Sequence, residues 1–454
     1  MASLIDRIKR LFKRNADRAD NTGSDNTSAE TTNTKGQHQS PVASVDPAEQ
    51  PGQIQQRTIA DTMASGTFTI QLRNDTNSST VYGYITGLAL DSGNRVFLLQ
   101  ADGKTPYYPA NPSSTGSKLE KNCSIPLGSP GNTVTCTIPR LAGGRIWFSV
   151  GTPLTFLLNP GPALVEPSIF NPAEPNHYTN FGFAEFTYNA AQVFANISYV
   201  DFVGLPISLD LTDTANNVQR VAGMTNYGPQ TIANGLIAQT RRDGRRWSSL
   251  IVNDKAGNLL RILSPNSGIT LNPDWFQTYW TDYVNQVYTR YSTTALTVNT
   301  QAVWRDVSGT ITNPSSSSNN NPAFTFSTSG QPNPPPTFPK PSARDIFSCN
   351  SGPFATGSNP ETNVIIPRLS AAFNRSTLLL SSTTPNGTNP TQYYQNSTTN
   401  HYARIVHAAN LDGKGYTFPY DDVTPDGGVG QEGAVFSFEP KALLVAVGGI
   451  GAHV

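Results

Sequence analysis

Hydrophobic and polar positions alternate in short runs between residues 66 and 212, which is the period of strands with one buried face. The first runs are GTFTIQLRND, STVYGYITGLAL and RVFLLQ, separated by turn-forming Asn, Asp, Ser and Gly. The alternation continues through GRIWFSV, LTFLL, NFGFAEFTYN and ISYVDFVGLPISLDL. We therefore expect a β domain over this part of the chain.

The pattern changes after residue 211, where residues 229–238, 243–250 and 367–378 show helical spacing. Asn272-Pro273-Asp274 combines an amide N-cap with proline at the first helical position, so it predicts a helix start. Apolar and aromatic residues follow it at helical spacing, and such a stripe more often packs in a core than binds a ligand: Trp275, Phe276, Tyr279, Trp280, Tyr283, Val284 and Val287.

Strand-like segments return near the C-terminus as RIVHAAN, KGYTFPY, AVFSFEP and ALLVAV. We therefore expect a mainly β protein, with a β sandwich or barrel built from both ends of the chain, residues 64–212 and 400–454. Residues 213–399 are expected to form a mixed α/β domain, with a flexible, Pro- and Asn-rich loop at 313–342 and a wide groove between the two domains.

Residues 1–14 form a short basic amphipathic pattern, with apolar residues on one helical face and Arg and Lys on the other. Such a helix suits peripheral contact with an anionic membrane surface, but it also fits a frayed helix without a partner. Asp6 argues against a mitochondrial presequence, and a secretory signal is not recognised. Residues 15–63 are polar and poor in aromatics, which predicts a disordered linker.

The formal net charge is zero and only 14% of residues are charged. This balance excludes a global basic field for nucleic acid and suits a surface that faces neutral sugars. The three cysteines leave two readings open, a Cys123–Cys136 hairpin disulfide or three reduced thiols. The histidines lack metal-ligand spacing, so we expect no metal and no cofactor.

Two acidic residues stand inside strand-like segments. Glu185 alternates with Phe183, Thr187 and Asn189 in FAEFTYN, and Asp201 lies between Val200 and Phe202 in YVDFV. A carboxylate among aromatic side chains is costly unless it is paired or used. Two such groups on neighbouring strands suit glycosidic bond cleavage, although most isolated acids in strands face solvent or cap a turn.

Three segments in order resemble glycoside hydrolase family 64, the laminaripentaose-producing β-1,3-glucanases, which are related to thaumatin-like proteins. They are residues 137–156 (TIPRLAGGRIWFSVGTPLTF), 183–209 around Glu185 and Asp201, and 401–423 (HYARIVHAANLDGKGYTFPYDDV). The resemblance implies a thaumatin-like fold, with Glu185 as general acid and Asp201 as general base of an inverting enzyme. Carboxyl groups about 6.5–9.5 Å apart would fit that mechanism.

The same resemblance points to candidate substrate contacts. Thr187 and Asn189 share the strand face of Glu185 and could hold sugar hydroxyls or support the acid. Phe194 is the nearest aromatic where relatives carry one beyond the Thr-x-Asn pair. The remaining candidates lie near the C-terminus, where Asp421 and Asp422 would line an acidic cleft and Tyr416 would offer a stacking surface. The sequence DDVTPDGG by itself is instead typical of a turn.

The first hypothesis is a monomeric enzyme that hydrolyses β-1,3-glucan in an endo fashion. The alternative is a non-catalytic thaumatin-like β-glucan-binding or cell-wall-associated protein. A third is a membrane-tethered protein that uses the fold for another partner, which rests on residues 1–14. Relatives of this family are usually secreted, so the compartment stays open.

Overall fold

The computed structural model describes residues 66–171, 173–312, 322–327 and 335–449, and these belong to one compact unit. The predicted N-terminal helix at 1–14 and linker at 15–63 lie outside the described residues. The expected loop at 313–342 is partly described, and there the prediction was wrong, because residues 323–327 and 337–339 form strands. Alternating Phe324, Phe326 and Phe338 are fully or almost fully buried, which explains this order.

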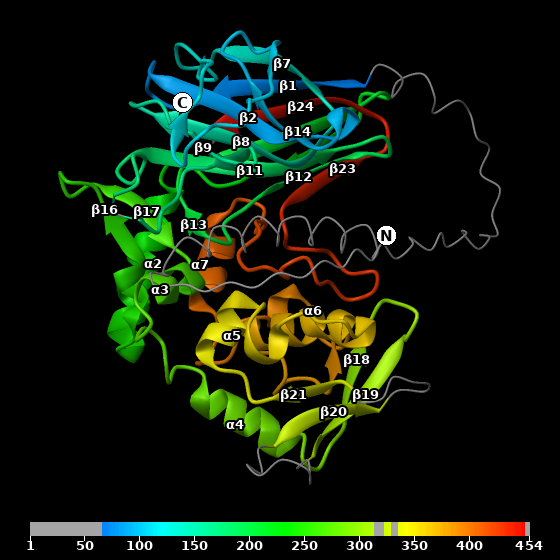
Figure 1. The fold of residues 1–454 in the computed structure, drawn as a ribbon. Helices are drawn as coiled ribbons and strands as arrows, with labels where there is room; N and C mark the ends of the chain where they lie inside the picture. Colours follow the sequence, from blue (N-terminus) through cyan, green and yellow to red (C-terminus); the bar gives the residue numbers. More distant parts are fainter. Residues whose placement is uncertain (1–65, 172, 313–321, 328–334, 450–454) are drawn as a thin grey trace, which may run out of the picture. The chain divides into compact units, whose positions relative to one another are not determined.

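Two open sheets carry the β part of the chain (Figure 1). The first has the order β15-β14-β24-β1-β7, with β15 Val218–Val221, β14 Ile207–Asp213, β24 Pro440–Val447, β1 Thr67–Asn74 and β7 Thr133–Pro139. The second has the order β23-β12-β11-β8-β2-β3-β4, with β6 also paired to β2; its strands are β23 Ala434–Ser437, β12 Val193–Ile197, β11 Asn180–Tyr188, β8 Leu141–Val150, β2 Val81–Ala89, β3 Arg95–Leu99, β4 Pro106–Tyr107 and β6 Ile125–Pro126.

The two sheets pack face to face through alternating apolar side chains. The Phe68 ring of β1 lies 5.2 Å from the Tyr188 ring of β11, and a Cβ on Gly83 of β2 would lie 2.7 Å from the Leu72 side chain of β1. Completely buried aliphatic side chains fill the space between the sheets, and burying such area stabilises the fold at about 25 cal/mol per Å². They include Ile70, Ile85, Leu209, Leu443 and Val445.

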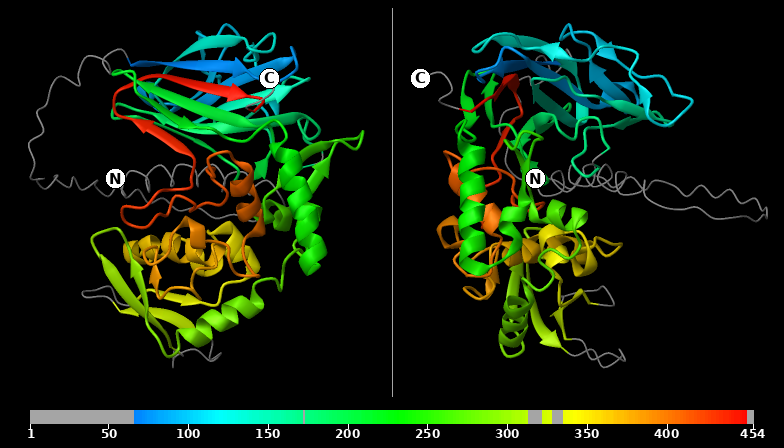
Figure 2. Two further views of the ribbon diagram at one scale, coloured as in Figure 1. Left: turned by 180° about the vertical axis from the view of Figure 1, so that it is seen from behind. Right: turned by 90° about the vertical axis from the view of Figure 1, so that its left-hand side faces the viewer.

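Both ends of the described chain meet in the first sheet. Strand β24 runs parallel to β1 and antiparallel to β14, so it lies between them (Figure 2). This pairing confirms that the first and last strands build one sheet. Among the described residues the strands form an open sandwich and no closed barrel, so the sandwich alternative holds.

The remaining segments are mixed α/β. Their helices are α2 Gly228–Asp243, α3 Pro265–Leu271, α4 Thr281–Arg290, α5 Ala343–Ser348, α6 Pro360–Asn374 and α7 His401–Ala409. One small sheet has the order β13-β17-β16 (Phe202–Val203, Leu259–Leu263, Ile251–Asn253), and another the order β21-β20-β19-β18-β22 (Thr337–Pro339, Ala323–Ser327, Asp306–Thr312, Leu296–Asn299, Thr383–Thr384). A third contains β10-β9-β5 (Ala163–Val165, Leu157–Asn159, Ser117–Lys118).

Three sequence predictions need correction here. The RIVHAAN segment is helix α7, because an Asn400 N-cap and the buried Tyr402, Ile405 and Val406 give it a helical face. KGYTFPY forms turns and an isolated bridge instead of a strand. The helix expected from Asn272 begins later, at Thr281, although its aromatic stripe is largely buried as predicted.

All three cysteines are free and buried, so the reduced reading holds. Burial raises the pKa of each thiol to about 12, which leaves them unreactive near neutral pH. No helix in the described part of the chain has both the length and the apolar character needed to cross a bilayer.

Candidate active site

Glu185 lies on the outer face of strand β11, the face that points away from the sandwich core. Phe186 and Tyr188 point inward and are almost completely buried, so the alternation places Phe183 and Glu185 outward. Register with β8 sets Glu185 opposite Arg145 and Phe183 opposite Trp147. Directly opposed residues share a face, so a carboxyl and a guanidinium stand beside a pair of aromatic rings.

An aromatic wall borders Glu185. The rings of Trp147 and Phe183 lie 4.8 Å apart, and Phe183 in turn lies 5.9 Å from Phe202. Glu185 keeps only 15% of its side chain exposed. Burial is the largest influence and raises the pKa of the Glu185 carboxyl, Arg145 opposes this, and the nearby Asp201 charge raises the pKa further. The site therefore favours a protonated Glu185, which is the state a general acid needs.

Asp201 follows strand β12 and directly precedes β13. Its backbone carbonyl accepts a hydrogen bond from the Ser264 amide at 2.9 Å, and its side chain is half-buried. Burial raises the pKa of the Asp201 carboxyl, whereas Arg145 lowers it. The interaction with Arg145 and the influence of Asp201 on Glu185 place both carboxyls in one electrostatic environment. A carboxyl pair of this kind supports acid and base roles for its two members.

Arg145 also binds a third carboxylate that sequence reasoning missed. Its Nη1 donates to Glu166 Oε2, while its Nε and Nη2 each lie 3.3 Å from Glu185 Oε1. Thr86 Oγ1 donates to Glu166 Oε1 at 3.2 Å. Glu166 follows the short strand β10 in a segment without clear periodicity, so only the three-dimensional register reveals its place.

The predicted neighbours of Glu185 lie close by along the hairpin. Thr187 is buried on the same strand face, and Phe194 stands opposite it on β12, half-buried. The Asn189 side chain accepts from the Ala191 and Gln192 amides, so its oxygen caps the β11–β12 turn. This geometry favours the supporting role for Asn189.

The outer face continues beyond Phe194 to strand β23 at the sheet edge (Figure 1). Phe436 stands opposite Phe194, so it shares the face of Thr187 and Glu185. Phe436 and Phe438 are 43% and 50% exposed, and their ring centroids lie 6.0 Å apart. The alternation in AVFSFEP was visible in the sequence, but the pairing of β23 with β12 was not.

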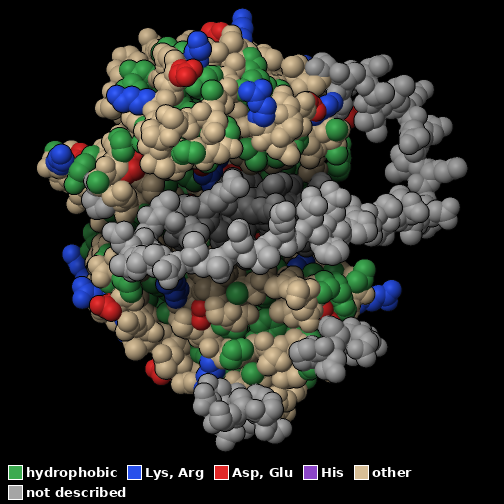
Figure 3. All heavy atoms as spheres, viewed as in Figure 1, with side chains coloured by type: hydrophobic (Ala, Val, Ile, Leu, Met, Phe, Trp, Pro, Cys, Tyr) green, Lys and Arg blue, Asp and Glu red, His purple; other side chains and the backbone are tan. Residues whose placement is uncertain are grey.

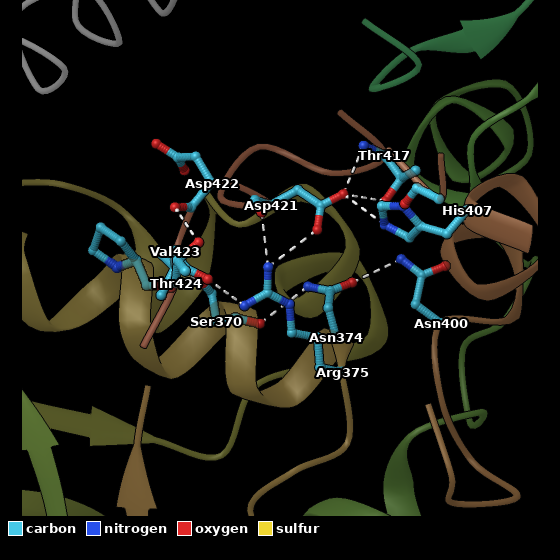
Figure 4. Close-up of polar contacts among 12 residues, drawn as sticks. Ser370, Asn374, Arg375, Asn400, His407, Thr417, Asp421, Asp422, Val423 and Thr424 are labelled. Carbon is cyan, nitrogen blue, oxygen red and sulfur yellow. Dashed lines mark hydrogen bonds and ion pairs between the residues drawn. The ribbon is translucent and has the colours of Figure 1, made fainter. Parts of the chain in front are cut away.

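Asp421 lies elsewhere than the sequence suggested. Its side chain is completely buried and binds Arg375 on one oxygen and His407 and Thr417 on the other (Figure 4). Burial opposes ionisation, but His407 and Arg375 outweigh it and lower the pKa of Asp421 to about 2. The carboxylate is therefore committed to internal partners, and a place in an exposed acidic cleft does not fit this geometry.

Asp422 and Tyr416 are both half-buried, and the Asp422 side chain points away from the Asp421 network (Figure 4). Burial is the main cause that raises the pKa of the Tyr416 hydroxyl, and the adjacent Asp422 adds to it. The Tyr416 backbone bonds to Ile197 and Tyr199, which places it beside the segment that leads to Asp201. Tyr416 is thus joined through its backbone to the strand end that leads to Asp201.

The described residues contain no group of three His, Cys, Asp or Glu side chains that could hold a metal. On the face shown in Figure 3, acidic and basic side chains are scattered among polar and apolar ones and do not gather into a patch of one sign. Such a surface suits a neutral ligand better than a polyanion.

Comparisons with known proteins identify a family and several relatives of this chain. Residues 66–447 match the family model described as Beta-1,3-glucanase (Glyco_hydro_64). A glucan endo-1,3-beta-glucosidase of Cellulosimicrobium cellulans is 28% identical over 319 residues, which is 69% of this chain and 53% of that protein. The chain thus spans about half the length of this curated relative.

Solved structures agree in fold. A laminaripentaose-producing beta-1,3-glucanase, crystallised in complex with laminaritetraose, superposes with a TM-score of 0.72 at 28% identity, covering 84% of this chain and 98% of that one. A beta-1,3-glucanase domain from Clostridium beijerinckii superposes with a TM-score of 0.63 at 22% identity, covering 84% and 98%, and this match supports the fold alone.

Proposed function

The chain belongs to the family of beta-1,3-glucanases described as Glyco_hydro_64, and we propose that it hydrolyses β-1,3-glucan at internal bonds. The observation that carries the proposal is the pairing of a half-buried Glu185 with Asp201 around Arg145, beside an aromatic wall. Sugar hydrolysis by two carboxyls needs one protonated and one ionised group, and Glu185, on which the charges of both Asp201 and Glu166 act, is the proposed protonated member.

In the proposed reaction, Glu185 donates its proton to the leaving glycosidic oxygen. Asp201 accepts a proton from a water molecule as that water attacks the anomeric carbon from the opposite side, so the configuration inverts. The bond to the leaving oxygen breaks as the bond to water forms. Neither residue forms a covalent intermediate, and the chemistry uses no cofactor.

The glucan chain is proposed to lie along the outer face of β11, β12 and β23. Phe194 and the exposed Phe436 offer ring faces to sugars, because aromatic rings combine apolar area with a fixed orientation. Asp422 and Tyr416 are proposed to face the same chain. We also propose that the fold is thaumatin-like and that the protein acts as a monomer in a groove beside this sheet.

The test compares purified wild type with Glu185→Gln and Asp201→Asn on laminarin and curdlan, with products separated by chromatography. Loss of a general acid or base typically costs about 10²–10⁴-fold in rate, so we expect oligosaccharides from wild type and almost none from either variant. Glu120→Gln, a change at an exposed carboxyl, is the matched control and should retain full activity. Anomeric NMR during early turnover should show inverted product.

A second candidate is a non-catalytic β-glucan-binding protein on the same fold. It is favoured by the Arg145–Glu185 ion pair, because a guanidinium beside a carboxyl opposes the protonated state. Wild type that binds curdlan in a pull-down but releases no soluble sugar would support this candidate and reject the enzyme.

A further inference from the structure

One guanidinium serves two carboxylates at the candidate site. Arg145 Nη1 makes its shortest contact with Glu166, and its other side lies 3.3 Å from Glu185. The three side chains are between 15% and 24% exposed, so water screens them weakly. The charge that Arg145 presents to Glu185 therefore depends on how completely Glu166 offsets it.

Glu166 is held in place by a chain of donors on the neighbouring strands. Trp147 Nε1 donates to Thr86 Oγ1 at 3.1 Å, and Thr86 Oγ1 donates to Glu166 Oε1 at 3.2 Å. Thr86 is completely buried, and register places it opposite Arg145 on β8. One oxygen of the Glu166 carboxylate thus accepts from Thr86 and the other from Arg145, and these two partners fix its orientation.

We propose that Glu166 is a positioning residue of the catalytic site, which binds Arg145 and offsets its positive charge, so that Arg145 does not hold Glu185 in its ionised form. This inference rests on the proposed function and deepens it. Three charged groups act on Glu185, namely Arg145, Asp201 and Glu166. With Glu166 ionised, the Arg145 charge is balanced and Asp201 remains as the net negative neighbour.

The direction of each influence agrees with this role. Burial raises the pKa of Glu185 most, Arg145 lowers it, and Asp201 and Glu166 both raise it. Removing the Glu166 charge leaves Arg145 free to stabilise ionised Glu185, so the pKa of Glu185 should fall. Removing the Arg145 charge leaves two acidic neighbours, so the pKa of Glu185 should rise.

The test measures the pH dependence of kcat/KM on laminarin for Glu166→Gln, Arg145→Gln and wild type. The Glu166→Gln amide keeps the shape, and its oxygen can accept from Arg145 while its NH₂ group donates to the Thr86 hydroxyl, so thermal unfolding should change little. We expect the alkaline limb of the Glu166→Gln pH profile to move to lower pH by roughly one unit, which is the order of shift that one nearby, weakly screened charge produces. The alkaline limb of the Arg145→Gln profile should move to higher pH. The control Glu120→Gln, whose charge is not among those acting on Glu185, should leave the limb unchanged.

The proposal is overturned if the alkaline limb of the Glu166→Gln pH profile stays in place or moves to higher pH. It is also overturned if kcat falls at every pH while the profile is unshifted. Failure of the proposed function is separately visible, because wild type would then release no products. In that case the Glu185 carboxyl is titrated directly by carbon-13 NMR of labelled glutamate, assigned by the signal lost in Glu185→Gln. A midpoint in Glu166→Gln lowered by roughly one unit supports the charge-balancing role, and an unchanged midpoint rejects it.

Discussion

Asp421→Asn should destabilise the protein strongly, because no orientation of an amide satisfies the partners of this carboxylate. Oδ2 accepts from the Thr417 amide at 3.0 Å and from the Thr417 hydroxyl at 2.6 Å, and it lies 3.0 Å from His407 Nε2. Oδ1 accepts from Arg375 Nη2 at 3.2 Å. An asparagine has one oxygen and one NH₂ group, so a donor must face either Arg375 or the donors of Thr417.

The size of the effect follows from burial and charge. Arg375 and Asp421 side chains are 4% and 0% exposed, and the rings of Tyr393 and Phe418 cover the guanidinium at 4.5 and 5.5 Å. Breaking a buried ion pair on one side costs about 3–5 kcal/mol, since it leaves an uncompensated charge. Because domains have about 5–15 kcal/mol of total stability, the variant should lose roughly a fifth of it or more.

The assay is urea unfolding at pH 7, followed by tryptophan fluorescence and circular dichroism. The exposed Asp274→Asn is the matched control and should change the free energy of unfolding by less than about 0.5 kcal/mol. A loss below about 1 kcal/mol in Asp421→Asn would refute the reasoning, because it would mean that Arg375 and Thr417 find other partners at little cost.

Acid unfolding tests the same carboxylate by protonating Asp421 in the wild-type protein. The folded pKa of Asp421 is about 2, which is below its usual value, so its stabilisation is present above pH 4 and is lost as the pH falls toward 2. The shift corresponds to about 2 kcal/mol. Wild type should therefore lose stability over this window by that much more than Asp421→Asn, and parallel acid profiles would contradict the assignment.

Two further predictions concern the sheet. Phe436→Ala should raise the KM for laminarin by roughly 2–10-fold with little change in kcat, since about 0.5–1.5 kcal/mol of ring contact is lost. Tyr227→Ala, at an aromatic residue that is even more exposed, should leave the KM unchanged, and equal effects of the two substitutions would refute a glucan-facing strand β23. Gly144→Ala should destabilise by roughly 1–3 kcal/mol, because its Cβ would lie 2.5 Å from the Phe186 ring. Gly357→Ala, in open space, is its control, and a stable Gly144→Ala would show that Phe186 moves aside.

The sequence predicts the sandwich well because each strand carries its own local signal. Period-2 alternation with buried Ile70 and Leu72 marks β1, and a continuous apolar run, ALLVAV, marks β24. The pairing of these two strands from opposite ends of the chain is seen only in the structure. The helix at 401–409 was missed because Ile405 and Val406 favour strands by propensity, while tertiary burial and the Asn400 cap decided for a helix.

At the candidate site, the sequence indicates Glu185 and Asp201 through acids placed in apolar strands. It does not indicate Glu166, because an acid in an irregular segment is ordinary until the fold brings a guanidinium to it. Asp421 was predicted to line an acidic cleft together with Asp422, but its side chain is completely buried. Its partners are Arg375, the C-cap residue of α6, and His407 of α7, and the sequence around Asp421 does not indicate either contact.

The buried Asp421 network also has a structural route to the candidate site. Asp421 fixes the backbone amide of Thr417, and the preceding Tyr416 bonds through its own backbone to Ile197 and Tyr199. Asp201 comes two residues after Tyr199. The C-terminal segment therefore clamps the strand end from which Asp201 extends, and Tyr402 reinforces it by donating to the Tyr199 carbonyl at 2.7 Å. A carboxylate that cannot touch substrate thus still helps to hold the candidate base, which is why Asp421→Asn should lower kcat even in the fraction that remains folded.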